Sequence, residues 1–257
     1  MIRFENVSFA YGAVPVLRDV SFTVAPGETV VMLGVSGSGK STILKLVAGL
    51  VHPQTGRIWI NGRDMTHAGE GEWSALRTKI GYVFQGGALF DSMTVGENIG
   101  YALLEHTDKS IAEIEQVARE TLRFLNLSEE IIDELPDALS GGMQRRVAIG
   151  RAVAAVDPLI MLYDEPTTGL DPISTKAITE LILKLQRVKR VSSIVVTHQI
   201  ADAFEVTNHF IVLHNGVMVF DGDGAALVRS SQPHVREFLT PFLDSVQAMP
   251  SDGRAGA

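Results

Sequence analysis

A short glycine-rich loop is the first feature of this chain that could do chemistry. Residues 34 to 42 read GVSGSGKST, a G-x-x-x-x-G-K-[ST] pattern between an apolar run and a helical stretch. Backbone N–H groups of such a loop point inward and cradle phosphate oxygens, and the following helix adds a favourable dipole. The alternative is a chance glycine turn, but a chance match is on the order of 1% in a chain of this length. The predicted phosphate-binding residues are Gly34, Val35, Ser36, Gly37, Ser38, Gly39, Lys40, Ser41 and Thr42.

Two acidic residues follow a second apolar run and complete a candidate hydrolytic centre. The segment LIMLYDEP places Asp164 and Glu165 at the end of a buried strand, where ligands bind in open α/β sheets. Lys40 can reach the β- and γ-phosphates, and Ser41 can ligate Mg²⁺ together with Asp164. Glu165 can take a proton from an attacking water. A solvated strand end is the alternative for the acidic pair taken alone.

The elements expected around these residues alternate between strands and helices. Strands are predicted at 29–33, 159–163 and 192–198, with helices over 40–50, over 110–127 and from near Ser140. Further helices are predicted after Asp171-Pro172 and, as a tail, over 231–247, and a hairpin turns at Asn215-Gly216. The first thirty residues are typical of strands. This order predicts a mainly parallel sheet with an antiparallel portion from the ends of the chain.

Composition narrows the class of protein. The chain has 257 residues, is 46% hydrophobic and carries a formal charge of −8, which argues against nucleic acid as a partner. It has no cysteine, which excludes disulfide and thiol chemistry and fits a cytosolic location. The start does not resemble a signal peptide, and no stretch approaches the roughly 18 apolar residues of a membrane helix. Any work at a membrane is therefore expected to go through a partner.

Several further motifs in a fixed order resemble those of an ATP-binding cassette (ABC) ATPase. They are Tyr11, Gln85, LSGGM at 139–143, TGLDP after Glu165, and His198. The resemblance implies an α/β fold of the P-loop NTPase type. A mainly parallel core sheet would carry an antiparallel β subdomain and a helical subdomain at about 86–156. The ATPase domain would span 1–230, and 231–257 would be a tail whose last part, MPSDGRAGA, is expected to be disordered.

The same resemblance implies how ATP and Mg²⁺ are bound within one chain. Tyr11 resembles the aromatic residue that stacks on adenine, and Gln85 the glutamine that ligates Mg²⁺ and senses the γ-phosphate. The metal would be held by Ser41, Gln85 and Asp164. His198 resembles the histidine that contacts the γ-phosphate and the catalytic glutamate, so Glu165, His198 and Lys40 are the expected catalytic residues. Each of these residues taken alone has a structural alternative. Tyr11 would be an exposed aromatic residue of a strand, Gln85 a polar residue at a strand end, and His198 a structural histidine with its hydrogen bonds satisfied.

A further group of residues is implied to act on the nucleotide of another subunit. Ser140, Gly141 and Gly142 resemble the signature that caps the γ-phosphate held by a second copy, and Asp171 the aspartate that communicates across that dimer. The phosphate loop and the signature lie far apart in the sequence, so two chains in head-to-tail contact would complete two sites. The signature departs from the family at Met143, where glutamine is usual and here follows as Gln144.

The segment after Gln85 suggests a membrane partner. Ala88, Leu89, Phe90 and Met93 would form an apolar patch that is a liability on a free monomer, so a docking groove for an integral-membrane permease is predicted. A core-packing loop is the alternative. QGGALFDSMTVGENIGYALLEH, LSGGMQRRVAIGRA, LIMLYDEPTTGLDPI and PHVREFL are similar to the Mla-type subfamily, which powers phospholipid traffic between bacterial membranes. That similarity implies a peripheral location at the cytoplasmic face of the inner membrane, through the permease, and a lipid-binding substrate-capture protein as a further partner.

Rival functions remain open. One is an ABC importer ATPase for amino acids or another small solute, although its linking segments match less well. A second is a soluble ABC ATPase without a permease, but the long coiled coil of DNA-repair members and the second cassette of translation members are absent from the sequence. A third is a non-hydrolysing regulatory cassette, which would be expected to lack Glu165 or Lys40.

Overall fold

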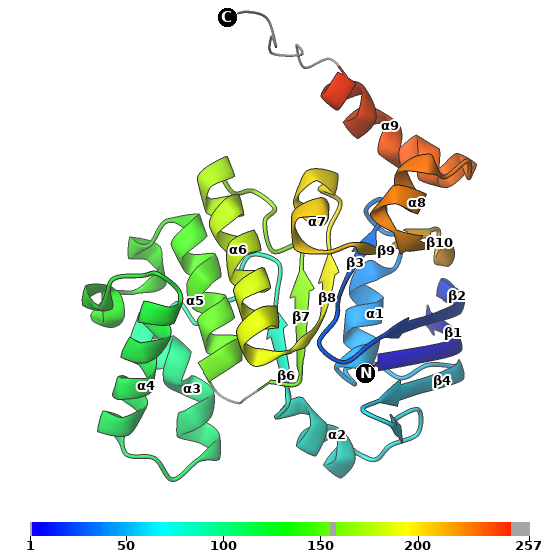
Figure 1. The fold of residues 1–257 in the computed structure, drawn as a ribbon. Coiled ribbons are helices and arrows are strands. Elements are labelled where there is room, and N and C mark those ends of the chain that lie inside the picture. Colours follow the sequence, from blue (N-terminus) through cyan, green and yellow to red (C-terminus); the bar gives the residue numbers. More distant parts are fainter. Residues whose placement is uncertain (1, 155–157, 248–257) are drawn as a thin grey trace, which may run out of the picture.

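Two sheets form the frame of the molecule (Figure 1). The computed structural model describes residues 2–154 and 158–247. The larger sheet has the order β10-β9-β3-β8-β7-β6, in which β10 alone pairs antiparallel to its neighbour. Its strands are β3 (Thr29–Leu33), β6 (Ile80–Val83), β7 (Ile160–Asp164), β8 (Ser192–Val196), β9 (His209–His214) and β10 (Val217–Asp223).

The smaller sheet is antiparallel and comes mainly from the beginning of the chain. Its order is β2-β1-β4-β5. Its strands are β1 (Ile2–Tyr11), β2 (Val14–Val24), β4 (Thr55–Ile60) and β5 (Arg63–Asp64). A mainly parallel core sheet with an antiparallel β portion was predicted from the sequence, and the structure confirms it.

The larger sheet separates two hydrophobic cores. Along β3, Val31 and Leu33 face one core and Val30 and Met32 the other, as the two-residue period of a strand requires. α1 and the small sheet fill the core of the second face, whereas α3 to α9 contribute to the first. The helices are α1 (Lys40–Val47), α2 (Glu70–Arg77), α3 (Val95–His106), α4 (Ile111–Phe124), α5 (Gly141–Ala154), α6 (Pro172–Lys189), α7 (Ile200–Val206), α8 (Gly224–Arg229) and α9 (Pro233–Gln247).

The local capping signals set the helix starts. The Ser110 side chain accepts a hydrogen bond from the N–H of Glu113, whose carboxylate returns to Ser110, which is the expected capping box. Asp171 caps α6 ahead of Pro172 by accepting hydrogen bonds from the N–H groups of Ile173 and Ser174. The ends come earlier than the spacing predicts, at Val47 and Phe124. Gly49 and Asn126 adopt positive φ angles of 65° and 54° just beyond, which stops the helical hydrogen-bond pattern.

The segment after Gln85 is more ordered than the docking loop expected there. Thr94 and Glu97 form a capping box at the start of α3. Neither α3 nor α2 was predicted from the sequence. The buried Asn98 side chain accepts a hydrogen bond from the Phe90 N–H and donates to the carbonyls of Phe90 and Met93. These bonds fix the turn at residues 90–93 against the start of α3.

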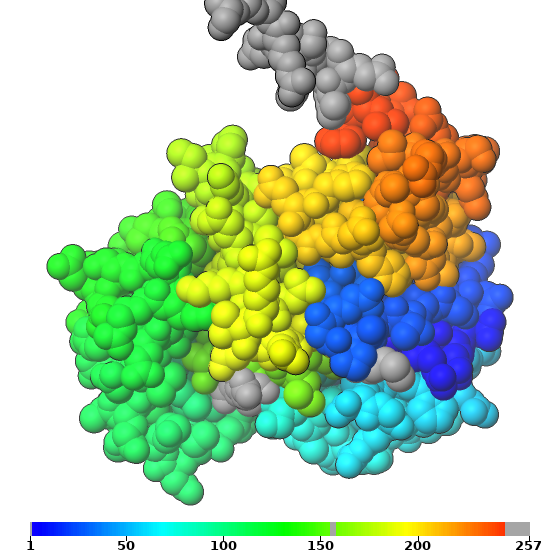
Figure 2. Space-filling view, viewed as in Figure 1, coloured from blue at the N-terminus to red at the C-terminus, as the bar shows by residue number. Residues whose placement is uncertain are grey.

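α3, α4 and α5 lie at the opposite end of the molecule from α8 and α9 (Figure 2). No helix within residues 2–154 and 158–247 is long and apolar enough to cross a membrane. α9 forms where a tail helix was predicted, whereas the stretch MPSDGRAGA lies outside the described residues. The division at residue 230 and the limits of the helical subdomain stay predictions.

Candidate functional site

The phosphate loop lies between the end of β3 and the start of α1. The Lys40 ammonium is buried and donates to the carbonyl oxygens of Gly34 and Val35 at 2.7 and 3.0 Å. Burial lowers the pKa of Lys40, and the carboxylates of Glu165 and Asp164 counter that shift. A cation in this place, held by loop carbonyls, is poised to exchange them for phosphate oxygens.

Glycines give the loop its shape. Gly34 has a φ of 150°, and a Cβ there would overlap the Leu213 carbonyl of β9, so the loop passes closer to that strand than another residue would allow. Gly39 has a φ of 104° and precedes α1 without offering a side-chain cap. The first N–H groups of α1 are therefore left for a ligand, and an anion suits them.

A candidate metal pair lies beside the loop. The Ser41 hydroxyl donates to Asp164 Oδ1 at 2.9 Å, although 123 positions separate the two residues. Burial raises the pKa of Asp164, while its hydrogen bond with Ser41 acts in the opposite direction. Burial raises the pKa of the neighbouring Tyr82, and the charge of Asp164 acts in the same direction. A partly buried carboxylate with a hydroxyl beside it fits Mg²⁺, which prefers oxygen ligands and retains water.

Glu165 is held by its backbone and by two side chains. Its φ is 48°, a left-handed conformation that costs a non-glycine residue energy, and its N–H donates to the Val196 carbonyl at 2.9 Å. Its Oε2 lies 3.0 Å from His198 Nδ1 and accepts a 2.9 Å hydrogen bond from the Thr168 hydroxyl. Glu165 and His198 were predicted from the sequence, but Thr168 was not. Its position in TTGLDP, three residues after Glu165, could have indicated it.

One cavity of about 360 Å³ joins these groups. Gln85, Glu165 and His198 line it together with the loop, so residues from three separate strand ends converge there. Val16 of β2 also lines it and was not predicted, because nothing in its sequence context distinguishes it from a core valine. The lining residues are Val16, Ser36, Gly37, Gly39, Lys40, Ser41, Thr42, Gln85, Glu165 and His198.

Other predicted residues lie outside this cavity's lining. Tyr11 is 46% exposed on β1, where its ring meets Phe9 edge to face and lies 5.9 Å from the Lys45 ammonium of α1. Ser140 is exposed and accepts a hydrogen bond from the Met143 N–H at the start of α5. Asp171 caps α6, and its hydrogen bond with the Ser174 hydroxyl lowers the pKa of Asp171. The structure does not bring the signature into the loop's own cavity.

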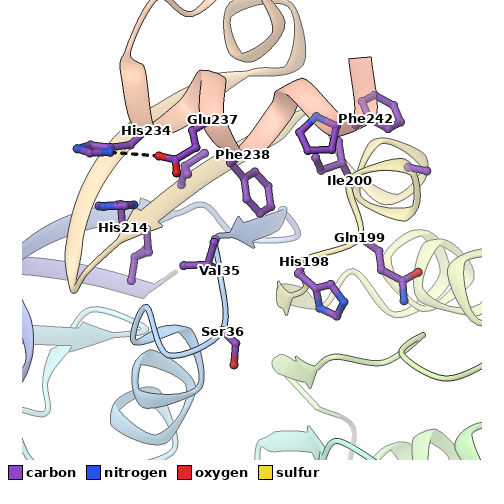
Figure 3. Close-up of a pocket in the computed structure, with 15 residues that line it drawn as sticks. Val35, Ser36, His198, Gln199, Ile200, His214, His234, Glu237, Phe238 and Phe242 are labelled. Atoms are coloured by element: carbon purple, nitrogen blue, oxygen red, sulfur yellow. Dashed lines mark ion pairs between the residues drawn. The ribbon is translucent and has the colours of Figure 1, made fainter. Parts of the chain in front are cut away.

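A larger cavity of about 870 Å³ adjoins the loop on its other side, under α9 (Figure 3). It shares Ser36 and His198 with the first cavity. Apolar side chains such as Phe238 and Phe242 dominate its walls. His234 approaches Glu237 to 3.9 Å at its edge. The smaller cavity suits a phosphate group better, because it holds Lys40 and the N-terminus of α1.

The segment around Gln85 is held by α5. The buried Arg145 side chain donates to the Phe84 carbonyl at 3.0 Å. Arg151 donates to the carbonyls of Ala88 at 2.8 Å and Gly87 at 3.1 Å. Neither arginine was predicted to act here. Since α5 begins with the signature, the helix joins the signature to the segment that bears Gln85.

The chain is similar to proteins of one family over most of its length. The family model described as ABC transporter matches residues 17–168. The chain is 36% identical over 260 residues to the Arabidopsis thaliana protein TRIGALACTOSYLDIACYLGLYCEROL 3, chloroplastic, covering 95% of this chain and 74% of the relative. It is also 36% identical to the probable ribonucleotide transport ATP-binding protein mkl of Mycobacterium tuberculosis, covering 93% and 66%. The chain thus spans about two thirds to three quarters of these relatives.

The chain is also similar to a relative named for a different substrate and to a protein of known structure. The Fe(3+) ions import ATP-binding protein FbpC of Escherichia coli is 36% identical, with 98% of this chain and 70% of the relative covered. The fold is similar to a dimeric ATP-binding cassette in a post-hydrolysis state bound to ADP and Pi. That similarity has a TM-score of 0.79 at 33% identity and covers 87% of this chain and 98% of the other.

Proposed function

The chain belongs to the ABC transporter family and is an ATPase, and from that premise we propose that it powers phospholipid transport through a membrane permease. ATP would be bound and hydrolysed between two head-to-tail copies of the chain. The observation that carries the membrane partner is the connection between Gln85, which lines the phosphate cavity, and an exposed groove a few residues further on. The lipid substrate is supported by the similarity to the Mla-type subfamily.

The proposed chemistry follows from the groups in the cavity. The loop N–H groups and Lys40 hold the β- and γ-phosphates, and Glu165 lies where it can accept a proton from the attacking water. As the water oxygen bonds to the γ-phosphorus, the bond to the β–γ bridging oxygen breaks and ADP leaves. His198, bonded to Glu165, orients that carboxylate and contacts the γ-phosphate.

Mg²⁺ would be held by Ser41, Gln85 and Asp164, and when bound it would neutralise charge on the phosphates. The Ser41–Asp164 hydrogen bond already sets two of the three side chains at one place. Tyr11, exposed beside α1, would provide the face on which adenine stacks.

The second copy would supply Ser140, Gly141 and Gly142 to the nucleotide. Ser140 and Gly141 are exposed, which supports this arrangement, whereas Gly142 is buried against Ser174 of α6. The unusual Met143 packs against the core. The Gln144 amide donates to the carbonyls of Pro136 and Leu139 at 2.7 and 3.3 Å. Gln144 therefore holds the backbone that precedes the signature. Because Met143 packs against the core, Ser140 and Gly141 remain exposed. Asp171 would communicate across the same interface.

The permease would dock in a groove of about 760 Å³ beside the Gln85 segment. Ala88 and Phe90 line it, and Phe90 is 39% exposed with its ring 4.7 Å from that of Tyr101. The Arg151 guanidinium lies 5.3 Å from the Phe90 ring centre and donates a hydrogen bond to the Ala88 carbonyl. Leu89 is partly buried against the core, so only part of the apolar patch predicted from the sequence faces this groove.

The substrate is the least constrained part of the proposal. One relative is named for trigalactosyldiacylglycerol, a lipid, whereas others are named for ribonucleotide and Fe(3+) transport. A small-solute importer is thus the second candidate. Under the lipid proposal a lipid-binding capture protein delivers the substrate, and the chain is peripheral on the cytoplasmic face of a bacterial inner membrane.

A charge at the docking groove tests the proposal. Phe90→Glu would place a carboxylate against the apolar surface of the permease, so it should move most of the chain from the membrane to the soluble fraction. ATP binding by the soluble variant should be unchanged. Val188→Glu, at a 62% exposed position on α6, is the matched control and should remain with the membrane.

The membrane and lipid parts of the proposal can fail separately. Wild-type membrane association of Phe90→Glu would contradict the docking site. Normal distribution of phospholipids between membranes in cells that lack the protein would contradict the lipid substrate and favour the small-solute alternative.

A further inference from the structure

A second groove lies on the helical part of the molecule, between α3, α4 and the short turn η1 (Glu129–Asp133). Its volume is about 610 Å³. Leu104 of α3 and Ile111 of α4 are 53% and 68% exposed along it. Both side chains expose aliphatic surface to one groove, and contiguous exposed apolar surface often marks an interaction site. The apolar residues that line the groove are Met93, Tyr101, Leu104, Ile111, Ile114 and Ile132.

Only acidic residues supply charge to its lining. They are Glu97, Glu105, Glu115 and Asp133, and no lysine or arginine among residues 2–154 and 158–247 lines it. Glu97 caps α3 and Glu115 pairs with Arg119 at 2.6 Å, whereas Glu105 forms no ion pair within the described part of the chain. Residues 94–137 contain eleven Asp and Glu against three Lys and Arg, a balance of −8 that equals the formal charge of the whole chain. The negative charge of the protein is therefore concentrated around this groove.

We propose that this groove binds a basic amphipathic helix from the cytoplasmic part of the permease, at a contact separate from the groove at Phe90. An apolar stripe with spacing i, i+3, i+4 would cover Leu104 and Ile111, and flanking Lys or Arg would meet the acidic rim. This inference rests on the proposed function, because it assumes that a permease is the partner.

Two features favour the permease as the occupant. Tyr101 lines both grooves, so a protein seated against Phe90 reaches the second groove across one side chain. Cytoplasmic segments of membrane proteins near the bilayer are enriched in Lys and Arg. A second copy of this acidic surface would be repelled, and so would anionic lipid headgroups.

Site-specific crosslinking tests the contact directly. The chain has no cysteine, so a single introduced cysteine carries a thiol-linked photo-crosslinker without background. The probe is placed in membranes at Leu104→Cys, at Phe90→Cys and, as the control, at Val188→Cys on α6. The expected result is that the first two attach to the same integral-membrane protein, at different cytoplasmic segments. The segment attached to Leu104→Cys should be amphipathic and rich in Lys and Arg, and the control should attach to neither segment.

The outcomes separate this inference from the function on which it rests. If Phe90→Cys attaches to an integral-membrane protein and Leu104→Cys attaches to none, or to a different protein, the second contact is wrong and the proposed function stands. If neither position attaches to an integral-membrane protein, both proposals are overturned. Attachment of Leu104→Cys to an acidic or wholly apolar segment of the permease would contradict the charge argument.

A charge reversal sharpens the test. Glu105→Lys should weaken binding of the chain to permease-containing membranes by about five-fold at roughly 0.05 M salt, and the difference should shrink at about 1 M salt. Glu120→Lys is the control on α4, since Glu120 is exposed, accepts a hydrogen bond from the Gln116 amide and does not line the groove. Both variants should keep the ATPase activity of the soluble chain. Equal weakening by the two variants would show a nonspecific charge effect and overturn the inference.

Discussion

Two helices of this protein begin at glycine-rich segments, and they differ in what surrounds them. α1 begins at Lys40 inside a cavity that Gln85, Glu165 and His198 also line. α5 begins at Gly141 beside the exposed Ser140, away from that cavity's lining. Both helix starts present N–H groups that favour an anion. The chain thus surrounds one candidate anion site with the proposed catalytic side chains and leaves the other on its surface, as the proposed site between two copies would require.

The different settings follow from the elements that precede each helix. α1 follows β3, a strand in the interior of the larger sheet, so its first turn lies at the sheet's carboxyl edge among other strand ends. α5 instead follows the 3₁₀ turn η2 (Pro136–Ala138), so its first turn does not continue from the end of a strand. The same kind of helix start is therefore part of the proposed catalytic site in one place and a candidate contact surface in the other.

The largest expected effect is at the enclosed site. Glu165→Gln keeps the size of the side chain and removes the carboxylate that accepts a proton, so kcat for ATP hydrolysis should fall on the order of 10²-fold or more. ATP affinity should be near that of the wild type. Steady-state hydrolysis and equilibrium nucleotide binding measure the two effects, and near-normal turnover would remove Glu165 from its proposed role.

Lys40→Ala should instead weaken ATP binding itself, because the buried ammonium is the cation closest to the loop carbonyls and the expected phosphates. A loss of affinity of at least ten-fold is expected from one charge-assisted contact. Measuring the dissociation constant of labelled ATP decides the point. A variant that binds ATP as wild type but hydrolyses it slowly would place Lys40 with Glu165 in the chemical step alone.

Mixed dimers test whether the exposed site completes the enclosed one. A Lys40→Ala chain and a Ser140→Arg chain can form one interface that carries both changes and one that carries neither. Mixtures should therefore bind labelled ATP at up to one intact site per dimer, whereas each pure variant has two damaged sites. If mixtures bind no more ATP than either pure variant, the two anion sites do not act together.

A smaller effect on stability and turnover is expected where the start of α5 packs against α6. A Cβ at the buried Gly142 would overlap the Ser174 hydroxyl and lie 2.7 Å from the Ser174 Cβ. Gly142→Ala should therefore push α5 from α6, cost about 1–3 kcal/mol of stability and lower turnover several-fold. Adding Ser174→Gly removes the overlap and should restore part of both. Absence of any rescue, in melting temperature and in ATPase assays, would show that the crowding is not the cause.

The smallest effect is expected far from both helix starts, at His209. Its two ring nitrogens lie 2.6 Å from Glu28 and 2.7 Å from Asp221. Partial burial acts to lower the pKa of His209, but hydrogen bonds with Asp221 and Glu28 outweigh it and raise the pKa above its ordinary value. The protonated ring thus stabilises the folded chain fully below the unfolded pKa near 6.5, and this contribution is lost as pH rises through the folded value.

His209→Gln should abolish that part of the pH dependence, an effect of about 1 kcal/mol or less in the free energy of unfolding. Denaturant unfolding of wild type and variant between about pH 5.5 and 8.5 measures it. ATPase activity at one pH should hardly change. A wild-type stability that rises through this range relative to the variant would reverse the predicted sign.

Short-range signals account for most of what could be predicted. The glycine spacing of the phosphate loop, the Ser110 capping box and the Asp171-Pro172 start each depend on hydrogen bonds between residues a few positions apart. The same kind of signal, Thr94 with Glu97, was present for α3, but the segment was interpreted as a docking loop. Helix ends were placed too late, although Gly49 and Asn126, which have positive φ angles, are residue types that commonly end helices.

The sequence by itself determined the phosphate loop, the strand that leads into it and the class of fold, because those features follow from local backbone geometry and hydrophobic period. Only the tertiary structure decided which distant residues meet: Ser41 with Asp164, Glu165 with His198, and Val16 with the loop. It also decided that Leu89 packs inward while Phe90 faces a groove. The reason is that strand order and helix packing set these contacts, and both depend on burial summed over the whole chain rather than on any single segment.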